Sequence, residues 1–149
     1  MKIEEEIKQT SFRNQRIKAL INLTFTSNYI EENLRKRLEP FGITLQQFNV
    51  LRILRGQYPK FVSNVLIKER MIDKMPDTSR LIDRLEIKGF VEKFPCKKDR
   101  RLVDIRISES GLALLKETDA MEMTFDDLLE NFTEEDATQL NELLDKIRG

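Results

Sequence analysis

Hydrophobic residues recur every three or four positions along most of this chain, which is the spacing of side chains on one face of an α-helix. The first such stretch runs from residue 3 to about residue 38 and contains neither glycine nor proline. It predicts one long helix with a break near Thr10 and Ser11, and Pro40 and Gly42 end it.

Three shorter helices follow, and each is preceded by a polar residue whose side chain can accept a hydrogen bond from a backbone amide of the first turn. Thr44, paired with Gln47 in a capping box, precedes a helix that runs to about residue 55; Ser63 precedes a helix over residues 65–71; and Asp77 precedes a helix that ends at Gly89. The last two of these helices are short and are joined by a tight turn, so together they predict a helix-turn-helix.

The hydrophobic period then changes to two, which is typical of β-strands. It does so in residues 90–94 and 102–107, where Val103, Ile105 and Ile107 alternate with polar side chains. The segment between the two strands is rich in Lys and Arg. We therefore expect a β-hairpin with a basic tip, and a helix-turn-helix followed by a hairpin is a winged helix.

Two further amphipathic helices are predicted after the hairpin, the first from about Ser108 to Asn131 and the second after the capping residue Thr133. These helices and the N-terminal one carry more apolar surface than a small winged helix can cover. We expect them to pack against a second copy of the chain. The alternative is that they complete the core of a monomer.

The predicted fold class is mainly α with a small β-hairpin, namely a winged helix-turn-helix with flanking dimerisation helices. We expect residues 1–149 to form a single domain, with residues 41–116 as the DNA-binding lobe and residues 1–40 and 117–149 as the dimerisation helices. At 149 residues, with 40% hydrophobic and 35% charged residues, the chain can bury a core without disulfides or metals. We expect no cofactor and no metal site.

Cys96 is the only cysteine, and the N-terminus lacks the basic and apolar regions of a secretion signal. No segment approaches the roughly 20 apolar residues that cross a bilayer. We therefore expect a cytoplasmic protein with no membrane partner.

The net charge of zero hides a strong asymmetry along the chain. Residues 1–116 contain 24 Lys and Arg against 15 Asp and Glu, a balance of +9, whereas residues 117–149 contain 2 against 11, a balance of −9. Such a chain can present a basic face to a polyanion and keep its acidic end away from it. Charge alone is equally consistent with ordinary solvated helix faces.

The helix after Asp77 carries polar residues that we expect to contact DNA in the major groove. Their hydroxyl and guanidinium groups suit phosphate oxygens and the acceptor atoms of guanine, and they lie opposite the apolar Leu81 and Leu85. A polar helix face alone is more typical of solvent cover, but its place between a turn and a basic hairpin favours DNA contact. The four candidates are Thr78, Ser79, Arg80 and Arg84.

The hairpin tip supplies a second set of candidates, because a short basic loop fits the negative potential of the minor groove. These candidates are Lys97, Lys98, Arg100 and Arg101. Asp99 lies among them, and we expect it to orient a neighbouring arginine rather than to touch DNA. A solvated turn is the alternative, since turns often contain Lys and Asp.

Two other classes of protein compete with this interpretation. An enzyme is disfavoured, because the chain has no His, one Cys and no Gly-rich phosphate loop, so the usual nucleophile and base pairs and metal clusters are missing. A winged-helix protein-interaction module without DNA binding is the second alternative, and the basic residues 97–101 argue against it.

Three segments at consistent spacing resemble the multiple-antibiotic-resistance regulator (MarR) family. They are the run from Asp77 to Val91, the Asp99-Arg-Arg101 of the hairpin, and the Ile107-Ser-Glu-Ser-Gly111 that enters the next helix. The segment Thr44–Leu51 is also similar to a helix of that family, whereas residues 67–76 are more charged and slightly longer than the family's usual turn.

The resemblance implies a homodimer that binds a pseudo-palindromic operator in double-stranded DNA and regulates transcription, most often as a repressor. It assigns the family's recognition-helix contacts to Thr78, Ser79 and Arg80, and its wing arginine to Arg101.

The resemblance also implies a way of regulating such a protein. Many family members respond to a small aromatic ligand bound between the dimerisation and DNA-binding regions, and the candidates for that site here are Phe25, Tyr29 and Phe48, which core packing explains equally well. Other members sense oxidation through a cysteine near the N-terminus. Cys96 lies in the hairpin instead, so a redox-responsive regulator that uses Cys96 stays an alternative.

Overall fold

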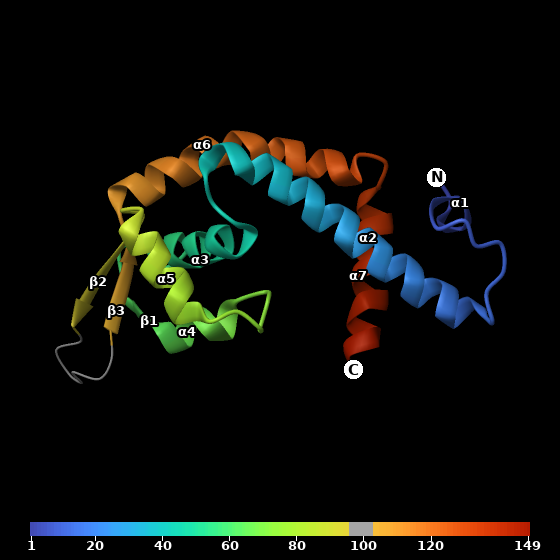
Figure 1. Ribbon diagram of the computed structural model, residues 1–149, viewed down its shortest axis with the longest axis horizontal. Helices are drawn as coiled ribbons and strands as arrows, with labels where there is room; N and C mark the ends of the chain where they lie inside the picture. Colours follow the sequence, from blue (N-terminus) through green and yellow to red (C-terminus); the bar gives the residue numbers. More distant parts are fainter. Residues whose placement is uncertain (96–102) are drawn as a thin grey trace. The chain divides into compact units, whose positions relative to one another are not determined.

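The computed structural model describes residues 1–95 and 103–149, with the backbone alone for residues 121–126 (Figure 1). Helices predominate, with one small antiparallel sheet. In chain order the elements are α1 (Ile3–Glu6), α2 (Gln15–Leu38), η1 (Glu39–Phe41), α3 (Leu45–Arg55), β1 (Val62–Ser63), α4 (Asn64–Arg70), α5 (Thr78–Ile87), β2 (Val91–Pro95), β3 (Val103–Ile107), α6 (Glu109–Phe125), η2 (Asp126–Leu129) and α7 (Glu134–Arg148).

The chain divides into two compact units, Met1–Leu115 and Lys116–Gly149, and α6 begins in the first and continues into the second. The first unit contains the N-terminal helices, the helix-turn-helix formed by α4 and α5, and the sheet, which we call the wing sheet because its strands β2 and β3 form the predicted wing hairpin. The second contains most of α6, η2 and α7. The division into a lobe and dimerisation helices expected from the sequence stays a prediction.

The N-terminal helix is interrupted where the sequence predicts a break. Helix α1 ends at Glu6 and α2 begins at Gln15, so Thr10 and Ser11 lie between them. Asn14 caps α2, because its side-chain oxygen accepts a hydrogen bond from the backbone N–H of Ile17 at 2.9 Å. Of the 24 residues of α2, Leu38 alone is buried.

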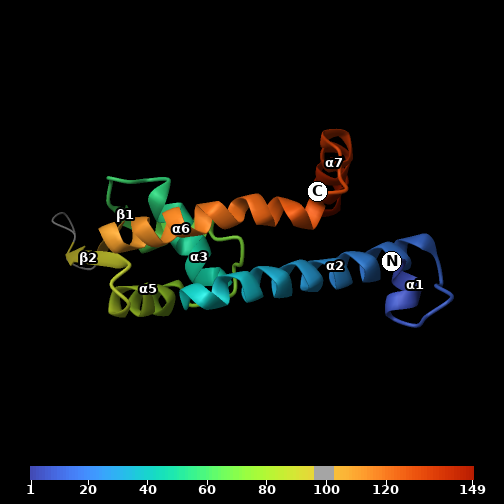
Figure 2. The same cartoon turned by 90° about the horizontal axis from the view of Figure 1, so that it is seen from above.

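The core of the first unit lies where α3, α4 and α5 pack against one another and against the strands. Figure 2 shows α3 and strand β2 close to α5. Leu54 of α3, Ile67 of α4 and Leu85 of α5 are almost completely buried, as are Ile105 and Ile107 of β3. Burial of a side chain of this size contributes about 1.5–3 kcal/mol. This packing fixes α5 against the rest of the unit.

The sheet has three strands in the order β1-β3-β2, and both neighbouring pairs are antiparallel. The predicted hairpin is confirmed for β2 and β3, in which Glu92 faces Arg106. The prediction of a two-stranded hairpin is incomplete, however, because β1 adds a third strand in which Val62 faces Ile105. A strand of two residues is too short to show a period of two, so the sequence pattern could not reveal it.

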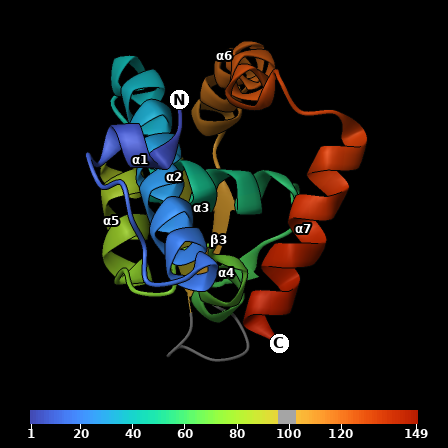
Figure 3. The same cartoon turned by 90° about the vertical axis from the view of Figure 1, so that its right-hand side faces the viewer.

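The second unit ends with helix α7, which runs to the C-terminal end of the chain (Figure 3). Thr133 caps the start of this helix with a capping box, as the sequence predicts. The backbone N–H of Asp136 donates to the Thr133 hydroxyl at 3.1 Å, and the backbone N–H of Thr133 donates to the Asp136 carboxylate at 2.9 Å. The backbone and hydroxyl hydrogen bonds from Thr133 hold the pKa of the Asp136 carboxyl below its ordinary value.

The apolar stripe of α7 is exposed. Leu140, Leu143 and Ile147 all expose a third or more of their surface, and no residue of α7 is buried. In the parts of the chain that the structure describes, no helix combines the length and the apolar character that a membrane span requires.

Candidate nucleic-acid interface

Helix α5 begins at Thr78 because Asp77 caps it. The Asp77 carboxylate accepts hydrogen bonds from the backbone N–H groups of Ser79 at 3.1 Å and of Arg80 at 3.3 Å. A cap of this kind stabilises a helix by about 0.5–2 kcal/mol. The same carboxylate lies 3.6 Å from Nε of Arg80, whose side chain is 80% exposed, so the guanidinium remains accessible. The predicted cap is confirmed, and it fixes the first turn of α5.

The two faces of α5 have different environments. Ile82 and Leu85 are buried where α5 packs against α3, α4 and β2. Ser79, Arg80 and Arg84 are exposed. Because Arg80 and Arg84 are four residues apart, their guanidinium groups project from the same side of the helix. The structure therefore presents one hydroxyl and two permanently charged donors together on a rigidly held helix.

Thr78 differs from the other predicted contacts on this helix. It is only 6% exposed, so its hydroxyl is not presented with the side chains of Ser79 and Arg80. The sequence pattern counted Thr78 as polar and hence exposed, whereas the first residue after the cap is turned into the packed side of the helix-turn-helix. The burial of Thr78 argues against a direct contact between its hydroxyl and DNA.

Asn64, the first residue of α4, was not singled out by the sequence. Its side-chain Nδ2 donates a hydrogen bond to Oγ of Ser79 at 2.7 Å, which joins the two helices of the helix-turn-helix at their N-terminal ends. Among the described residues, the other polar atom of this side chain, Oδ1, is buried without a hydrogen-bond partner. An Asn directly after a helix cap carries no motif that would have identified it.

Lys93 of β2 joins the wing sheet to α5. Its Nζ lies 2.7 Å from Oδ1 of Asp83 and 2.8 Å from Oε2 of Glu86. The hydrogen bonds to Asp83 and then to Glu86 raise the pKa of Lys93 above its ordinary value. The two carboxylates of α5 are thereby neutralised in part by one ammonium group, which leaves the exposed arginines as the dominant charge on this helix.

The opposite face of the sheet carries an arginine close to two aromatic rings. Arg106 donates to the Glu92 carboxylate at 2.7 Å, and its guanidinium lies 4.8 Å from the ring centroid of Phe61 and 5.9 Å from that of Phe94. The two rings meet edge to face at 5.2 Å. These contacts tie β2 and β3 together at the base of the predicted wing.

The predicted wing contacts lie outside the described residues. These are Lys97, Lys98, Asp99, Arg100 and Arg101, and Cys96 lies outside them as well. The described chain ends at Pro95 and resumes at Val103, which face each other in the β2–β3 ladder. The wing assignments therefore stay predictions from the sequence.

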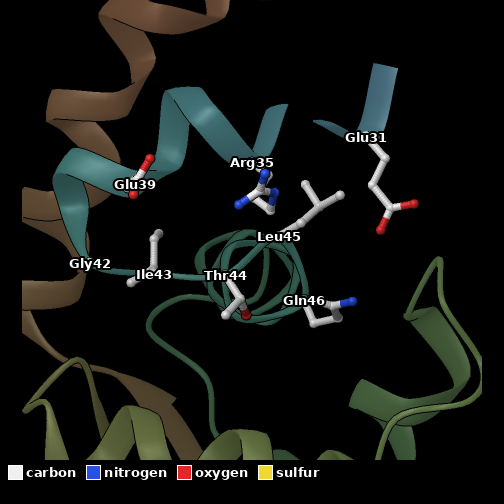
Figure 4. A pocket seen from close by; sticks show the side chains of 8 residues that line it. All are labelled: Glu31, Arg35, Glu39, Gly42, Ile43, Thr44, Leu45 and Gln46. Carbon is white, nitrogen blue, oxygen red and sulfur yellow. The ribbon is translucent and has the colours of Figure 1, made fainter. Parts of the chain in front are cut away.

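A hollow of about 450 Å³ lies where the end of α2 approaches the start of α3. Figure 4 shows the Arg35 guanidinium above the first turn of α3, between the carboxylates of Glu31 and Glu39. The remaining lining residues are Gly42, Ile43, Thr44, Leu45 and Gln46. The hollow thus offers a cationic group, acidic groups and apolar surface within a single site.

The predicted ligand residues do not line this hollow. Phe48 is 6% exposed and belongs to the core, with the Arg52 guanidinium 5.7 Å from its ring centroid. Phe25 and Tyr29 are exposed on α2. The structure does not gather these three aromatic residues into one described pocket, and a ligand site that uses them stays a prediction.

Lys88, at the C-terminal end of α5, connects this helix to the rim of the hollow. Its ammonium group donates to the carbonyl oxygen of Gly42 and, at 3.3 Å, to Oε1 of the buried Gln47. The same Gln47 oxygen accepts the backbone N–H of Thr44 at 3.1 Å, which completes the predicted capping box of α3. Two rim residues, Gly42 and Thr44, are therefore linked to the end of α5.

Among the described residues, no group of three or more His, Cys, Asp or Glu side chains is arranged to hold a metal ion.

Comparison with known proteins identifies the family. Residues 43–103 match the model of the MarR family. The transcriptional regulator PecS from Dickeya dadantii is 31% identical over 128 residues, which cover 84% of this chain and 76% of PecS.

Solved structures share the fold. A mutant of MarR from Escherichia coli, crystallised with operator DNA, superimposes with a TM-score of 0.79 at 25% identity and covers 93% of this chain and 99% of that one. BpsR from Bordetella bronchiseptica, whose DNA binding is regulated by 6-hydroxynicotinic acid, gives a TM-score of 0.75 at 20% identity, over 89% of this chain and 99% of that one, and so shows likeness of fold alone.

The matched segment spans the capped helix α3, the helix-turn-helix and the start of β3. It includes three of the segments on which the sequence resemblance rested, whereas the fourth, Ile107–Gly111, lies beyond it. The relatives match most of the remaining chain as well. The chain is a member of the MarR family of transcriptional regulators.

Proposed function

We propose that this protein binds a specific sequence in double-stranded DNA and regulates transcription from it, with α5 as the helix that enters the major groove. The observation that carries the proposal is the exposed row of Ser79, Arg80 and Arg84 on a helix whose other face is buried. Guanidinium groups bind guanine and phosphate, and a hydroxyl adds a short-range hydrogen bond. The relative from Escherichia coli crystallised with operator DNA supports this use of the fold.

The predicted wing completes the interface in this proposal. Lys97, Lys98, Arg100 and Arg101 follow the end of β2, and a short basic loop fits the minor groove. Asp99 orients a neighbouring arginine. The anchoring of β2 to α5 through Lys93 supports a fixed spacing between the two contacts.

The active form in this proposal is a homodimer that binds a pseudo-palindromic operator. The exposed apolar side chains of α2 and α7 support it, because surfaces of this kind are normally covered by a partner. They include Leu20, Leu23, Leu143 and Ile147. Residues 1–40 and 117–149 supply the dimer contacts, and residues 41–116 form the DNA-binding lobe. A two-fold dimer presents its two α5 helices to two half-sites one helical turn apart.

We propose that the protein represses transcription, because repression is the commoner mode of regulation in the MarR family, which the sequence resembles. We propose no enzymatic activity, since the family consists of transcriptional regulators. The cytoplasm is the proposed location, because there the protein can reach DNA.

We further propose that a small aromatic acid binds in the hollow between α2 and α3 and releases the protein from DNA. The Arg35 guanidinium can pair with the carboxylate of such a ligand in competition with Glu31 and Glu39, which also line the hollow, and Ile43 and Leu45 support an apolar ring. The contacts of Lys88 with Gly42 and Gln47 supply a physical connection from the rim of this hollow to α5.

The test of DNA binding begins with selection of sequences from random duplexes, followed by titration of the selected and a scrambled duplex at several salt concentrations. Arg84→Ala should lower the preference for the selected duplex by about 1–3 kcal/mol, because alanine cannot reach the base that arginine binds. Arg101→Ala should weaken binding to both duplexes, and the salt slope should fall by about one for each phosphate that the protein no longer neutralises.

Lys36→Ala is the matched control, since Lys36 is an exposed basic residue of α2 outside the proposed interface. It should change neither affinity nor salt slope. Wild-type protein that selected no sequence and bound duplexes with no salt dependence would support the protein-interaction module instead.

A further inference from the structure

The hydroxyl of Ser79 is not free to rotate as an ordinary surface serine is. Asn64 Nδ2 lies 2.7 Å from Ser79 Oγ and donates to one of its lone pairs. A hydroxyl has one O–H donor and two acceptor lone pairs, so the donor of Ser79 is left for another acceptor. Asn64 itself is only partly exposed, whereas Ser79 lies on the exposed face of α5.

The two polar atoms of the Asn64 amide have unequal surroundings. Oδ1 is buried without a hydrogen-bond partner among the described residues, while Nδ2 is used on Ser79. Turning the amide over would place Oδ1 against the hydroxyl and bury two unused N–H donors in its place, and an unpaired buried donor costs about 1–3 kcal/mol. One unpaired acceptor is the smaller cost, so the packing favours Asn64 as the donor.

We propose that Asn64 is a positioning residue that sets Ser79 as a hydrogen-bond donor toward DNA. Ser79 then contacts an acceptor, either a phosphate oxygen or an acceptor atom on a base edge such as purine N7 or thymine O4. This inference rests on the proposed function, and it adds a residue of α4 to the determinants of DNA recognition by α5.

A double-mutant cycle tests the proposal on the full-length protein, with the duplex selected by wild-type protein as the probe. Ser79→Ala and Asn64→Ala should each weaken binding to that duplex, by roughly fivefold or more for a good hydrogen bond. The double variant should bind about as well as Ser79→Ala alone, because Asn64 acts only through the hydroxyl. Urea unfolding of each variant identifies any general loss of stability.

Asn64→Asp provides the opposite polarity at nearly the same size. Its carboxylate accepts the Ser79 O–H and removes the donor, but it also adds a negative charge close to DNA. Measured in the Ser79→Ala background, the substitution reports the charge alone, so the difference between the two backgrounds reports the donor. The expected result is a larger loss of affinity in the presence of Ser79 than in its absence.

Whether the acceptor of the Ser79 hydroxyl belongs to a base or to a phosphate can be read from the DNA sequences that the variant selects. If Ser79 reads a base, selection from random DNA with Asn64→Asp should change the preferred base at one position of each half-site. If Ser79 contacts a phosphate, the selected sequence should stay the same while affinity for selected and scrambled duplexes falls together. Both outcomes support the positioning role.

Val65→Ala is the matched control, since Val65 is the next residue of α4 and is 58% exposed. Its effect should add to that of Ser79→Ala without coupling. Additive effects of Asn64→Ala and Ser79→Ala, or an Asn64→Asp effect that is equal in both backgrounds, would overturn the inference. Such a result would leave the proposed function intact, since that function fails only if the wild-type protein selects no sequence.

Discussion

Gly111 lies at the junction between the wing sheet and α6, where the structure leaves no room for a side chain. A Cβ at this position would stand 2.3 Å from the carbonyl oxygen of Phe90 and 2.7 Å from Cγ1 of Ile107. The Phe90 carbonyl is itself held, because it accepts the backbone N–H of Ser108 at 3.0 Å. The Ser108 hydroxyl donates to the carbonyl of Gly89 at 2.6 Å and accepts the backbone N–H of Gly111 at 3.1 Å. Hydrogen bonds therefore hold the backbone at Phe90 and at Gly111, so neither segment can move away to make room for a Cβ.

Gly111→Ala should destabilise the fold by a net amount of about 1–3 kcal/mol. Overpacking in a fixed environment costs about 1–3 kcal/mol. Disruption of the Ser108 to Phe90 hydrogen bond adds about 0.5–1.5 kcal/mol. The better helix propensity of alanine returns about 0.5–1 kcal/mol. In a chain of this length each kcal/mol lowers the melting temperature by about 2–4 °C.

Gly56→Ala is the matched control for this substitution. Gly56 ends α3 with right-handed helical backbone angles, and a Cβ there would lie 3.6 Å from the nearest atoms, an ordinary contact. It should leave stability unchanged or raise it by about 0.4–1 kcal/mol. Urea unfolding at one fixed protein concentration compares the two variants, because dimer stability depends on concentration. Equal unfolding midpoints for both would refute the packing argument at Gly111.

Three further outcomes are expected. Light scattering at micromolar concentration should return twice the chain mass of 17.6 kDa, and a value near the chain mass would reject the dimer. Because folding raises the pKa of Lys93, the ion pairs of this residue should contribute fully to the free energy of unfolding below pH 10.5, the ordinary pKa of lysine, and the contribution should be lost as the pH rises through the pKa of Lys93 in the folded protein. The difference in free energy of unfolding between wild type and Lys93→Met should therefore shrink at high pH. A difference that grew with pH would contradict this expectation. Cys96→Ser should leave DNA affinity and its response to peroxide unchanged, whereas peroxide release of the wild type alone would give Cys96 a regulatory role.

Features that depend on neighbouring residues could be predicted from the sequence. The caps at Thr44, Asp77 and Thr133 are set by side chains within three residues of the amides they bind, so their spacing is visible in the chain. The strands β2 and β3 could be predicted for the same reason, since each is long enough to show alternation.

Features that join residues far apart in the chain could not be predicted from the sequence. The pairing of Val62 with Ile105 and the contact of Lys88 with Gly42 both depend on how the core closes, which a local pattern does not encode. The burial of Thr78 has the same origin, because polarity alone does not show which way the first turn of α5 faces.

The contact between Lys88 and the rim of the hollow has a consequence for the order in which ligand and DNA bind. If occupation of the hollow weakens DNA binding by some factor, thermodynamic linkage requires DNA to weaken occupation of the hollow by the same factor, and a tenfold effect corresponds to about 1.4 kcal/mol. Protein that is already bound to its operator would then have a lower affinity for the ligand than free protein. At ligand concentrations between the dissociation constants of the free and the DNA-bound protein, induction would proceed by capture of dimers that have dissociated. The residence time on DNA would then limit how fast a gene responds.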